Sequence, residues 1–180
     1  VLPKTIKSIG KYAFCETNIK SINLPEGLES IGEAAFKGCG NLELAELPST
    51  LKHIGNWAFY RCANISISTL PGSIETLGKG VFGVAEQGGK ITSFTFPDHI
   101  TELPDSMFYY RSGLKEIHLP ANLKKIGTRV ICYTDITELV VPESVTEIAD
   151  GAFMYAPLTN VVLPKSLKKV PALAFAGMQI

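Results

Sequence analysis

The sequence predicts a β-rich, right-handed solenoid, in which similar units coil with one parallel sheet and one short helical turn per unit. Three observations predict this fold. An apolar-proline pair recurs along the chain, apolar columns stay in phase with it, and a strand-like segment precedes each proline after the first. We therefore expect one domain over residues 1–180, built from about eight units of 22–26 residues.

The prolines mark the repeat. They stand 22, 23, 23, 26, 23, 22 and 22 residues apart and number the units 1 to 8: Pro3, Pro25, Pro48, Pro71, Pro97, Pro120, Pro142 and Pro164. Unit 4 is the longest because of an insertion at residues 83–90. Since proline has no N–H to donate to a ladder, a proline directly after a strand ends the pairing at the same height in each unit.

Apolar columns predict what the units bury. In unit 2 they are Leu28 and Ile31, followed by the Ala-Phe pair Ala35-Phe36, and Ile131 replaces the phenylalanine in unit 6. A unit of this length cannot bury these side chains by itself, so we expect each Phe to stack on the Phe of the next unit. Strands such as residues 114–119 then pair side by side into one parallel sheet.

A column of small residues lies between the apolar residues and the Ala-Phe pair. It is mostly glycine, but Pro104 and Pro171 also occupy it. Proline requires a φ near −65° and is favoured at the first residue of a helix. We therefore expect a short helical turn that begins at this column and carries the Ala-Phe pair.

The combined pattern resembles the BspA-like leucine-rich repeats. The pattern is Leu-Pro-x-x-Leu-x-x-Ile-Gly-x-x-Ala-Phe-x-x-Cys followed by Leu-x-x-Ile-x-Leu, and residues 25–47 match it almost throughout. The resemblance covers the whole chain and implies the leucine-rich-repeat fold, by convention α/β. It implies a bacterial or protozoan protein at the cell surface or secreted, with a role in adhesion and no catalytic motif. Both ends fall inside a unit, so we expect a segment excised from a longer array.

Composition argues against several classes of function. Seventeen basic residues balance seventeen acidic ones, whereas nucleic-acid binders usually carry a basic excess. No apolar stretch is long enough to span a membrane, and the three histidines occupy different repeat positions. We therefore expect no enzyme activity, cofactor, metal, nucleic-acid partner or membrane insertion, while the oligomeric state stays open.

Four cysteines follow the phenylalanine column, at Cys15, Cys39, Cys62 and Cys132. A buried thiol packs as a small hydrophobe, so we expect all four to be unpaired and mostly buried. A disulfide between Cys39 and Cys62, which share a register in adjacent units, is the alternative.

The outer face of the strands is the predicted partner-binding surface. Side chains alternate in and out along a strand, which predicts outward pairs of Leu44 with Ile67 and of Val140 with Val162. Apolar patches on a solvated face can mark interaction sites, although β-propensity alone also explains them. The predicted contact residues for a protein or glycan ligand are Leu44, Glu46, Ile67, Thr69, Glu116, His118, Glu138, Val140 and Val162.

A second candidate surface consists of Tyr and Arg residues after the phenylalanine column: Tyr60, Arg61, Tyr109, Tyr110, Arg111, Tyr133 and Tyr155. Such residues anchor interfaces, but they are also common on a half-buried ridge. The main functional hypothesis is an extracellular protein-interaction or adhesion module that binds a host or cell-surface partner through the repeat surface. The alternative is a passive structural spacer within a larger surface protein.

Overall fold

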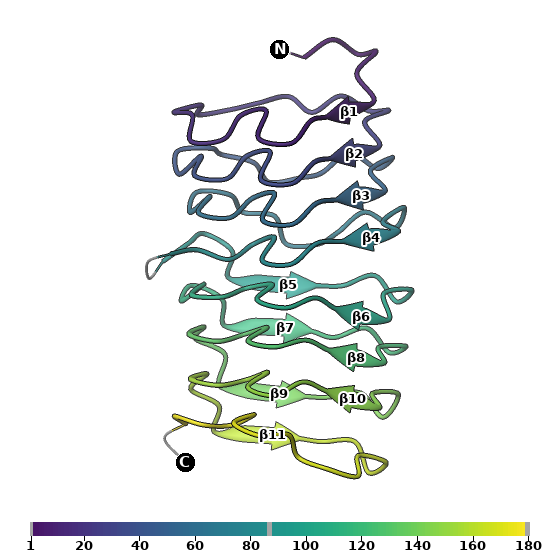
Figure 1. Cartoon of the computed structure of the whole chain (residues 1–180), viewed down its shortest axis with the longest axis vertical. Coiled ribbons are helices and arrows are strands. Elements are labelled where there is room, and N and C mark those ends of the chain that lie inside the picture. Colours follow the sequence, from purple (N-terminus) through teal and green to yellow (C-terminus); the bar gives the residue numbers. More distant parts are fainter. Residues whose placement is uncertain (1, 86–87, 179–180) are drawn as a thin grey trace.

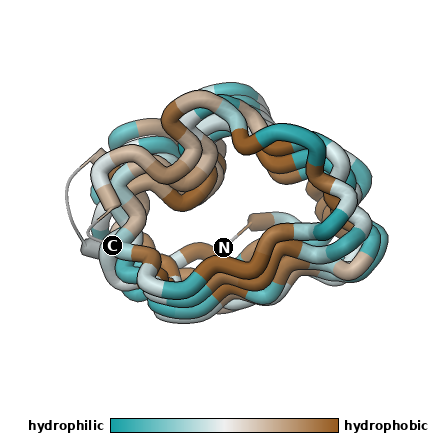
Figure 2. Tube along the Cα trace, turned by 90° about the horizontal axis from the view of Figure 1, so that it is seen from below, coloured by the Kyte–Doolittle hydropathy of each residue, from teal (hydrophilic) through white to brown (hydrophobic). Residues whose placement is uncertain are grey.

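The chain winds into a solenoid with its two ends at opposite ends of the stack (Figure 1). This computed structural model describes residues 2–85 and 88–178, so residues 86 and 87 of the expected insertion lie outside the described part. Hydrophobic residues recur at the same places in successive turns of the coil (Figure 2). The predicted solenoid of parallel strands is therefore confirmed.

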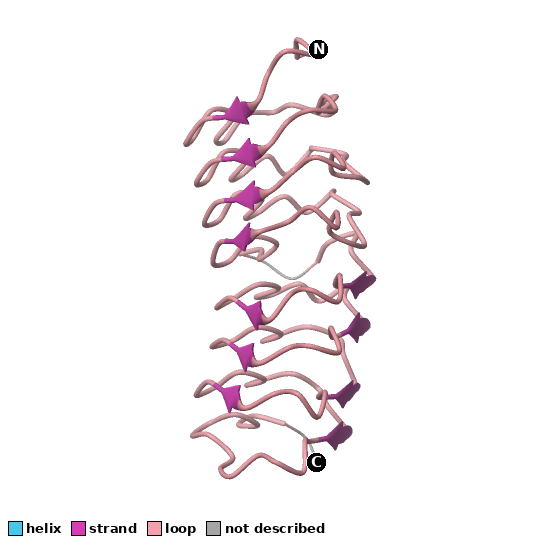
Figure 3. Ribbon diagram, turned by 90° about the vertical axis from the view of Figure 1, so that its right-hand side faces the viewer, coloured by secondary structure: helices cyan, strands magenta, loops and turns pink. Residues whose placement is uncertain are grey.

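The strands form two columns (Figure 3). The first column consists of short strands before the small-residue column: β1 (Ser8–Ile9), β2 (Ser30–Ile31), β3 (His53–Ile54), β4 (Thr76–Leu77), β6 (Glu102–Leu103), β8 (Lys125–Ile126) and β10 (Glu147–Ile148). The second contains β5 (Ser93–Thr95), β7 (Glu116–His118), β9 (Glu138–Val140) and β11 (Asn160–Val162). The sequence predicts only the second column, so the expectation of one sheet is wrong. Strands of two residues are too short to show a period-two pattern.

Pairing is parallel, and equivalent residues of successive units face one another. In the first column β1 to β4 form one ladder, and β6, β8 and β10 form another. In the second column β5 pairs with β7, and β9 pairs with β11. The pairing therefore stops between β4 and β6 and again between β7 and β9.

Turns, and no helix, follow the small-residue column in the part of the chain that the structure describes. In unit 1 the N–H groups of Ala13 and Cys15 donate to carbonyls three residues earlier, whereas those of Tyr12 and Phe14 donate to the next unit. This alternation leaves no room for the i→i−4 bonds of a helix. The second residue after the column also has a φ of 51° to 65° in every unit, outside the right-handed helical region. The expected helical turn is therefore wrong.

The small-residue column closes the first ladder. The N–H groups of Gly32, Gly55, Gly78, Gly127 and Ala149 each donate to an Ile or Leu carbonyl of the preceding unit. A Cβ on Gly55 would lie 2.5 Å from the Glu33 nitrogen, so this close packing needs glycine. Pro104 and Pro171 have no N–H to donate, and among the described residues the ladder stops at both. The interpretation of these prolines as helix starts is therefore wrong.

The phenylalanine stack is confirmed. Phe36 and Phe59 are fully buried and parallel, with ring centroids 5.3 Å apart. The stack runs from Phe14 to Phe108, where Phe94 of β5 packs edge-on against Phe108 with centroids 5.0 Å apart. These rings fill the core between units 4 and 5, where the first ladder is interrupted.

Candidate protein-binding surface

The structure exposes seven of the nine predicted contact residues: Glu46, Thr69, Glu116, His118, Glu138, Val140 and Val162. Ile67 is instead fully buried, and Leu44 is half-buried and packed against the core. The expectation that Leu44 and Ile67 form an outward apolar contact is therefore wrong.

A change in the apolar pattern explains why these two side chains turn inward. Most units read Leu-x-x-Ile-x-Leu, whereas residues 42–47 and 65–70 have their apolar residues at the first, third and sixth positions. Alignment on the prolines puts Leu44 opposite Ser21, but Ser21 bridges to Glu43. A shift of one residue exchanges the two faces of a strand. The alternation in Ile65-Ser66-Ile67 was the sequence signal for burial.

The exposed residues fall into separate rows. Thr69 bridges to Thr95, which pairs with His118. Val140 pairs with Val162 through β9 and β11. Glu46 lies apart, along a groove in units 1 and 2. One groove is lined by Glu116, His118, Glu138 and Val140, and Val162 pairs with Val140, so these five residues lie near one another in units 5 to 7.

A groove of about 770 Å³ opens between β7 and β9, where the pairing of the second column stops. Four predicted contact residues line it: Glu116, His118, Glu138 and Val140. The His118 Nε2 atom lies 3.1 Å from Glu116 Oε1, and both side chains are more than half exposed. The groove thus presents carboxylates, an imidazole and an apolar side chain to a ligand.

Two valines extend this surface next to the groove. The exposed fraction is 68% for Val140 and 48% for Val162, which lies directly opposite it in the β9–β11 ladder. Interfaces commonly bury an apolar centre inside a polar rim. The valines supply such a centre, and Glu138 and Asn160 lie in the same two strands.

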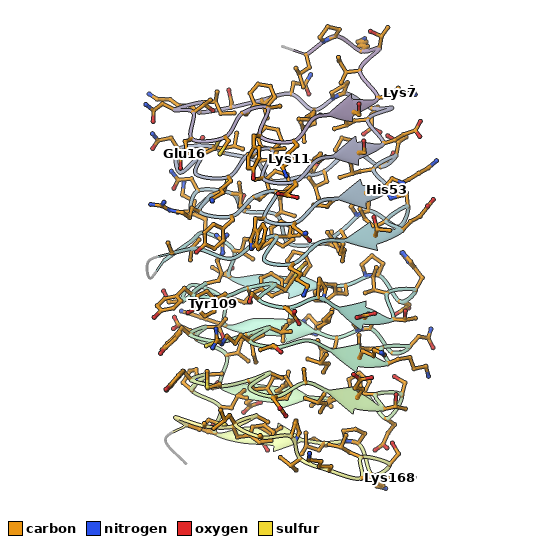
Figure 4. The ribbon with its side chains drawn as sticks, viewed as in Figure 1. Lys7, Lys11, Glu16, His53, Tyr109 and Lys168 are labelled. Carbon is orange, nitrogen blue, oxygen red and sulfur yellow. The ribbon has the colours of Figure 1, made fainter. Side chains whose placement is uncertain are left out.

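Tyr110, Tyr133 and Tyr155 form a column of neighbouring rings at another edge of the solenoid. The Tyr133 ring lies 4.3 Å from that of Tyr110 and 4.8 Å from that of Tyr155, centroid to centroid. Tyr109, beside this column, lies on the side away from the β1–β4 ladder (Figure 4). Tyr110 and Tyr133 are half-buried, as the ridge interpretation expects. Their rings contact one another, so the column contributes to the packing of units 5 to 7.

Arg111 is buried beneath that ridge instead of lying on it. Its Nε and Nη2 atoms donate to the Phe82 carbonyl at 2.9 and 2.7 Å, and its Nη atoms also reach the Cys62 carbonyl. Burial lowers the pKa of Arg111 to about 10, so the guanidinium stays charged at neutral pH. Arg111 therefore joins units 3, 4 and 5 from within.

All four cysteines are free, and Cys39, Cys62 and Cys132 are buried while Cys15 is half-buried. The Cys39 and Cys62 thiols each donate to a phenylalanine carbonyl of the preceding unit at 2.9 Å. The neighbouring Cys39 thiol, together with burial, raises the pKa of Cys62. The prediction of unpaired, mostly buried thiols is confirmed.

Residues 2–85 and 88–178 contain no group of three or more His, Cys, Asp or Glu side chains placed to hold a metal ion. No helix in these ranges is long and apolar enough to cross a membrane.

Comparison with known proteins identifies the family. The model of the BspA type leucine rich repeat region (6 copies) matches residues 1–87 and 85–180. The fold is similar to a leucine-rich repeat protein from Bacteroides ovatus, with a TM-score of 0.68 and 23% identity over 92% of this chain and 49% of that one. It is also similar to a leucine rich cell surface protein from Faecalibacterium prausnitzii, with a TM-score of 0.70 and 24% identity over 92% of this chain and 44% of that one.

The chain thus spans about half the length of these two solved proteins. No curated protein matches the sequence. At these identities the solved structures support the fold alone, and the match of the family model over both halves assigns the family. The chain belongs to the BspA-type leucine-rich-repeat family.

Proposed function

We propose that this chain is the protein-binding part of a cell-surface or secreted adhesion protein, and that it contacts its partner through the strand surface of units 5 to 7. This surface comprises Glu116, His118, Glu138, Val140 and Val162. Its partner is a protein of a host or of another cell. Membership of the family and the likeness to a leucine rich cell surface protein support this location and this general role.

The observation that carries the proposal is the exposed Val140–Val162 pair beside an open, charged groove. An exposed apolar patch rimmed by charged side chains is a common recognition surface, and β-propensity alone would not place a charged groove beside the two valines. Repetition in a solenoid also gives an extended surface suited to a protein partner.

Immobilised chain, incubated with an extract of extracellular matrix, tests the proposal. We expect a Val140→Thr/Val162→Thr double variant to lose at least about 80% of the captured protein, because the few residues buried at the centre of an interface supply most of its affinity. Threonine keeps the β-branched shape, so the fold should persist. Val170→Thr is the matched control, because Val170 is 55% exposed but lies outside this surface.

The passive spacer is the alternative function. It predicts that the wild-type chain and the double variant capture the same proteins in the same amounts. That result, obtained with folded variants, would refute the proposed surface. Loss of capture in the Val170→Thr control as well would also contradict it, since general apolar exposure would then explain the binding.

A further inference from the structure

The first strand column contains an open slot between units 4 and 5. β4 and β6 occupy successive positions in this column, yet they lie clearly farther apart than the other neighbours (Figure 3). A groove of about 780 Å³ occupies the gap and is lined by Glu75, Leu77, Glu102, Pro104 and other residues of the two units.

The backbone N–H and carbonyl groups of β4 and β6 that face the slot form no hydrogen bonds with each other among the described residues. In unit 6 the N–H groups of Lys124 and Lys125 donate to the Thr101 carbonyl, and in units 2, 3 and 4 the equivalent bonds also form. Among the described residues, no backbone bond links Thr101 or Glu102 to Glu75 in this way. The N–H groups of Thr101 and Glu102 and the carbonyls of Glu75 and Leu77 are thus free for another chain.

Pro104 explains why the ladder opens here. The equivalent glycines donate to the preceding unit and pack so closely that a Cβ would collide with its backbone. Pro104 has neither the N–H nor the small size, so Leu77 keeps an unpaired carbonyl. At the other end of the slot, the side chain that bonds a carbonyl of the preceding unit also differs from that in other units. The His99 ring reaches the Ile74 carbonyl at 2.7 Å, where short hydroxyls serve in other units, as Ser73 does for the Leu51 carbonyl at 2.6 Å.

Contacts between units 4 and 5 bound the slot at both ends, at His99 and at Asp105, and its middle is acidic. The Gly80 N–H donates to the Asp105 carbonyl at 2.8 Å, and the Lys79 ammonium lies 2.7 Å from the Asp105 carboxylate. This contact raises the pKa of Lys79 and lowers that of Asp105, so both groups stay charged. The two remaining carboxylates, Glu75 and Glu102, are exposed on either side of the opening.

The opposite flank of the same junction is already filled. There the Arg111 guanidinium donates to the carbonyls of Cys62 and Phe82. On this flank, the chain's own Arg111 side chain therefore supplies hydrogen bonds to backbone carbonyls of units 3 and 4. On the flank of β4 and β6, the described residues place no comparable side chain on the Leu77 carbonyl.

We propose that the slot between β4 and β6 binds an extended, basic segment of a partner protein, which enters as an additional strand. Its N–H groups donate to the Glu75 and Leu77 carbonyls, and its carbonyls accept from Thr101 and Glu102. A Lys or Arg side chain on its outer face lies between the carboxylates of Glu75 and Glu102. Main-chain pairing with an open sheet edge is a general mode of peptide recognition. The site is separate from the strand surface of units 5 to 7.

Amide hydrogen exchange of the isotopically labelled full chain, measured by NMR, tests the proposal. The probe is the acetylated and amidated peptide Leu-Lys-Lys-Ile-Gly, the sequence of residues 123–127, which forms a strand of the same column. We expect saturating peptide to slow exchange at Thr101 and Glu102 by about tenfold or more, because these amides gain hydrogen bonds. The already bonded amides of Lys124 and Lys125 are internal controls and should not change. Unchanged exchange at Thr101 and Glu102 with millimolar peptide would overturn the proposal.

Charge and backbone controls make the test specific. The peptide Leu-Glu-Glu-Ile-Gly should bind at least about tenfold more weakly, and Glu75→Gln or Glu102→Gln should each weaken the basic peptide about threefold to fivefold. Glu147→Gln, at the equivalent exposed position of β10, is the matched control and should have no effect. Equal binding of both peptides would refute recognition of a basic segment.

Two further variants test whether the peptide binds in the slot itself. Pro104→Gly restores a donor for the Leu77 carbonyl and should abolish peptide binding, while the glutamine variants keep the test valid if Pro104→Gly does not fold. The Val140→Thr/Val162→Thr variant should bind the peptide as the wild type does, so failure of the proposed function and failure of this inference are distinguishable. Protection of Thr101 that rises with protein concentration in the absence of peptide would identify a second copy as the occupant and overturn the proposal.

Discussion

A Phe59→Ala substitution tests whether the phenylalanine stack supports the solenoid. Phe59 is fully buried, and its ring centroid lies 5.3 Å from that of Phe36 and 6.0 Å from that of Phe82. Removing a buried Phe ring usually costs about 3–5 kcal/mol, and the cost is larger where neighbours cannot collapse into the cavity. Phe36 and Phe82 pack against Phe59 from both sides and limit the collapse of the cavity, so we expect the free energy of unfolding to fall by about 4 kcal/mol.

Urea unfolding measures this loss. Trp57 is the only tryptophan and lies two residues from Phe59, so its fluorescence reports on the same unit. Phe14→Ala is the control, because Phe14 is half-buried and stacks on Phe36 alone within the described column, and we expect it to cost about 1–2 kcal/mol. A loss below about 1 kcal/mol for Phe59→Ala, or equal losses at the two positions, would refute the stacked core as the source of stability.

Two other predictions follow from the burial of individual side chains. Ile67→Ser should lower the free energy of unfolding by about 3 kcal/mol, because Ile67 is fully buried. Thr69→Ser, on the exposed side of the same segment, should change it by less than about 0.5 kcal/mol. Similar urea midpoints for the two variants would contradict the assigned register. Thiol titration should find at most Cys15 reacting rapidly in the folded protein and all four thiols after denaturation without reductant. Only two thiols after denaturation would demonstrate a disulfide.

The sequence predicts the stacking more reliably than the local backbone. Phe36 and Phe59 recur in phase, and side chains that a single unit cannot bury have to meet in the next unit. The turns are harder to predict, because proline fits both a helix start and a position without a ladder donor. The left-handed backbone at Tyr12 and Trp57 carries no sequence signal, since large side chains seldom adopt it.

For the candidate surface, too, the sequence predicts the exposure of some residues correctly and that of others incorrectly. Val140 and Val162 follow the unit pattern of the second column, and the prediction that they face outward is confirmed. Ile67 departs from that pattern, because it alternates with the exposed Ser66 and faces the core. The groove beside Val140 depends on where β7 and β9 stop pairing, which residue types in the two strands do not reveal.

Interruptions of the repeat, more than its shared columns, create the two candidate sites. Where every unit donates a backbone N–H to the one before, the turns pack closely and leave no space between them, as at Gly55 and Gly78. Pro104 removes such a donor, and a groove opens next to it. A second groove opens where β7 and β9 separate. In a solenoid the regular units therefore provide stiffness, and the units that break the ladder provide the concave, hydrogen-bonding places that a partner can enter. In other chains of this family, a proline in the small-residue column is accordingly the position from which to begin a search for such sites.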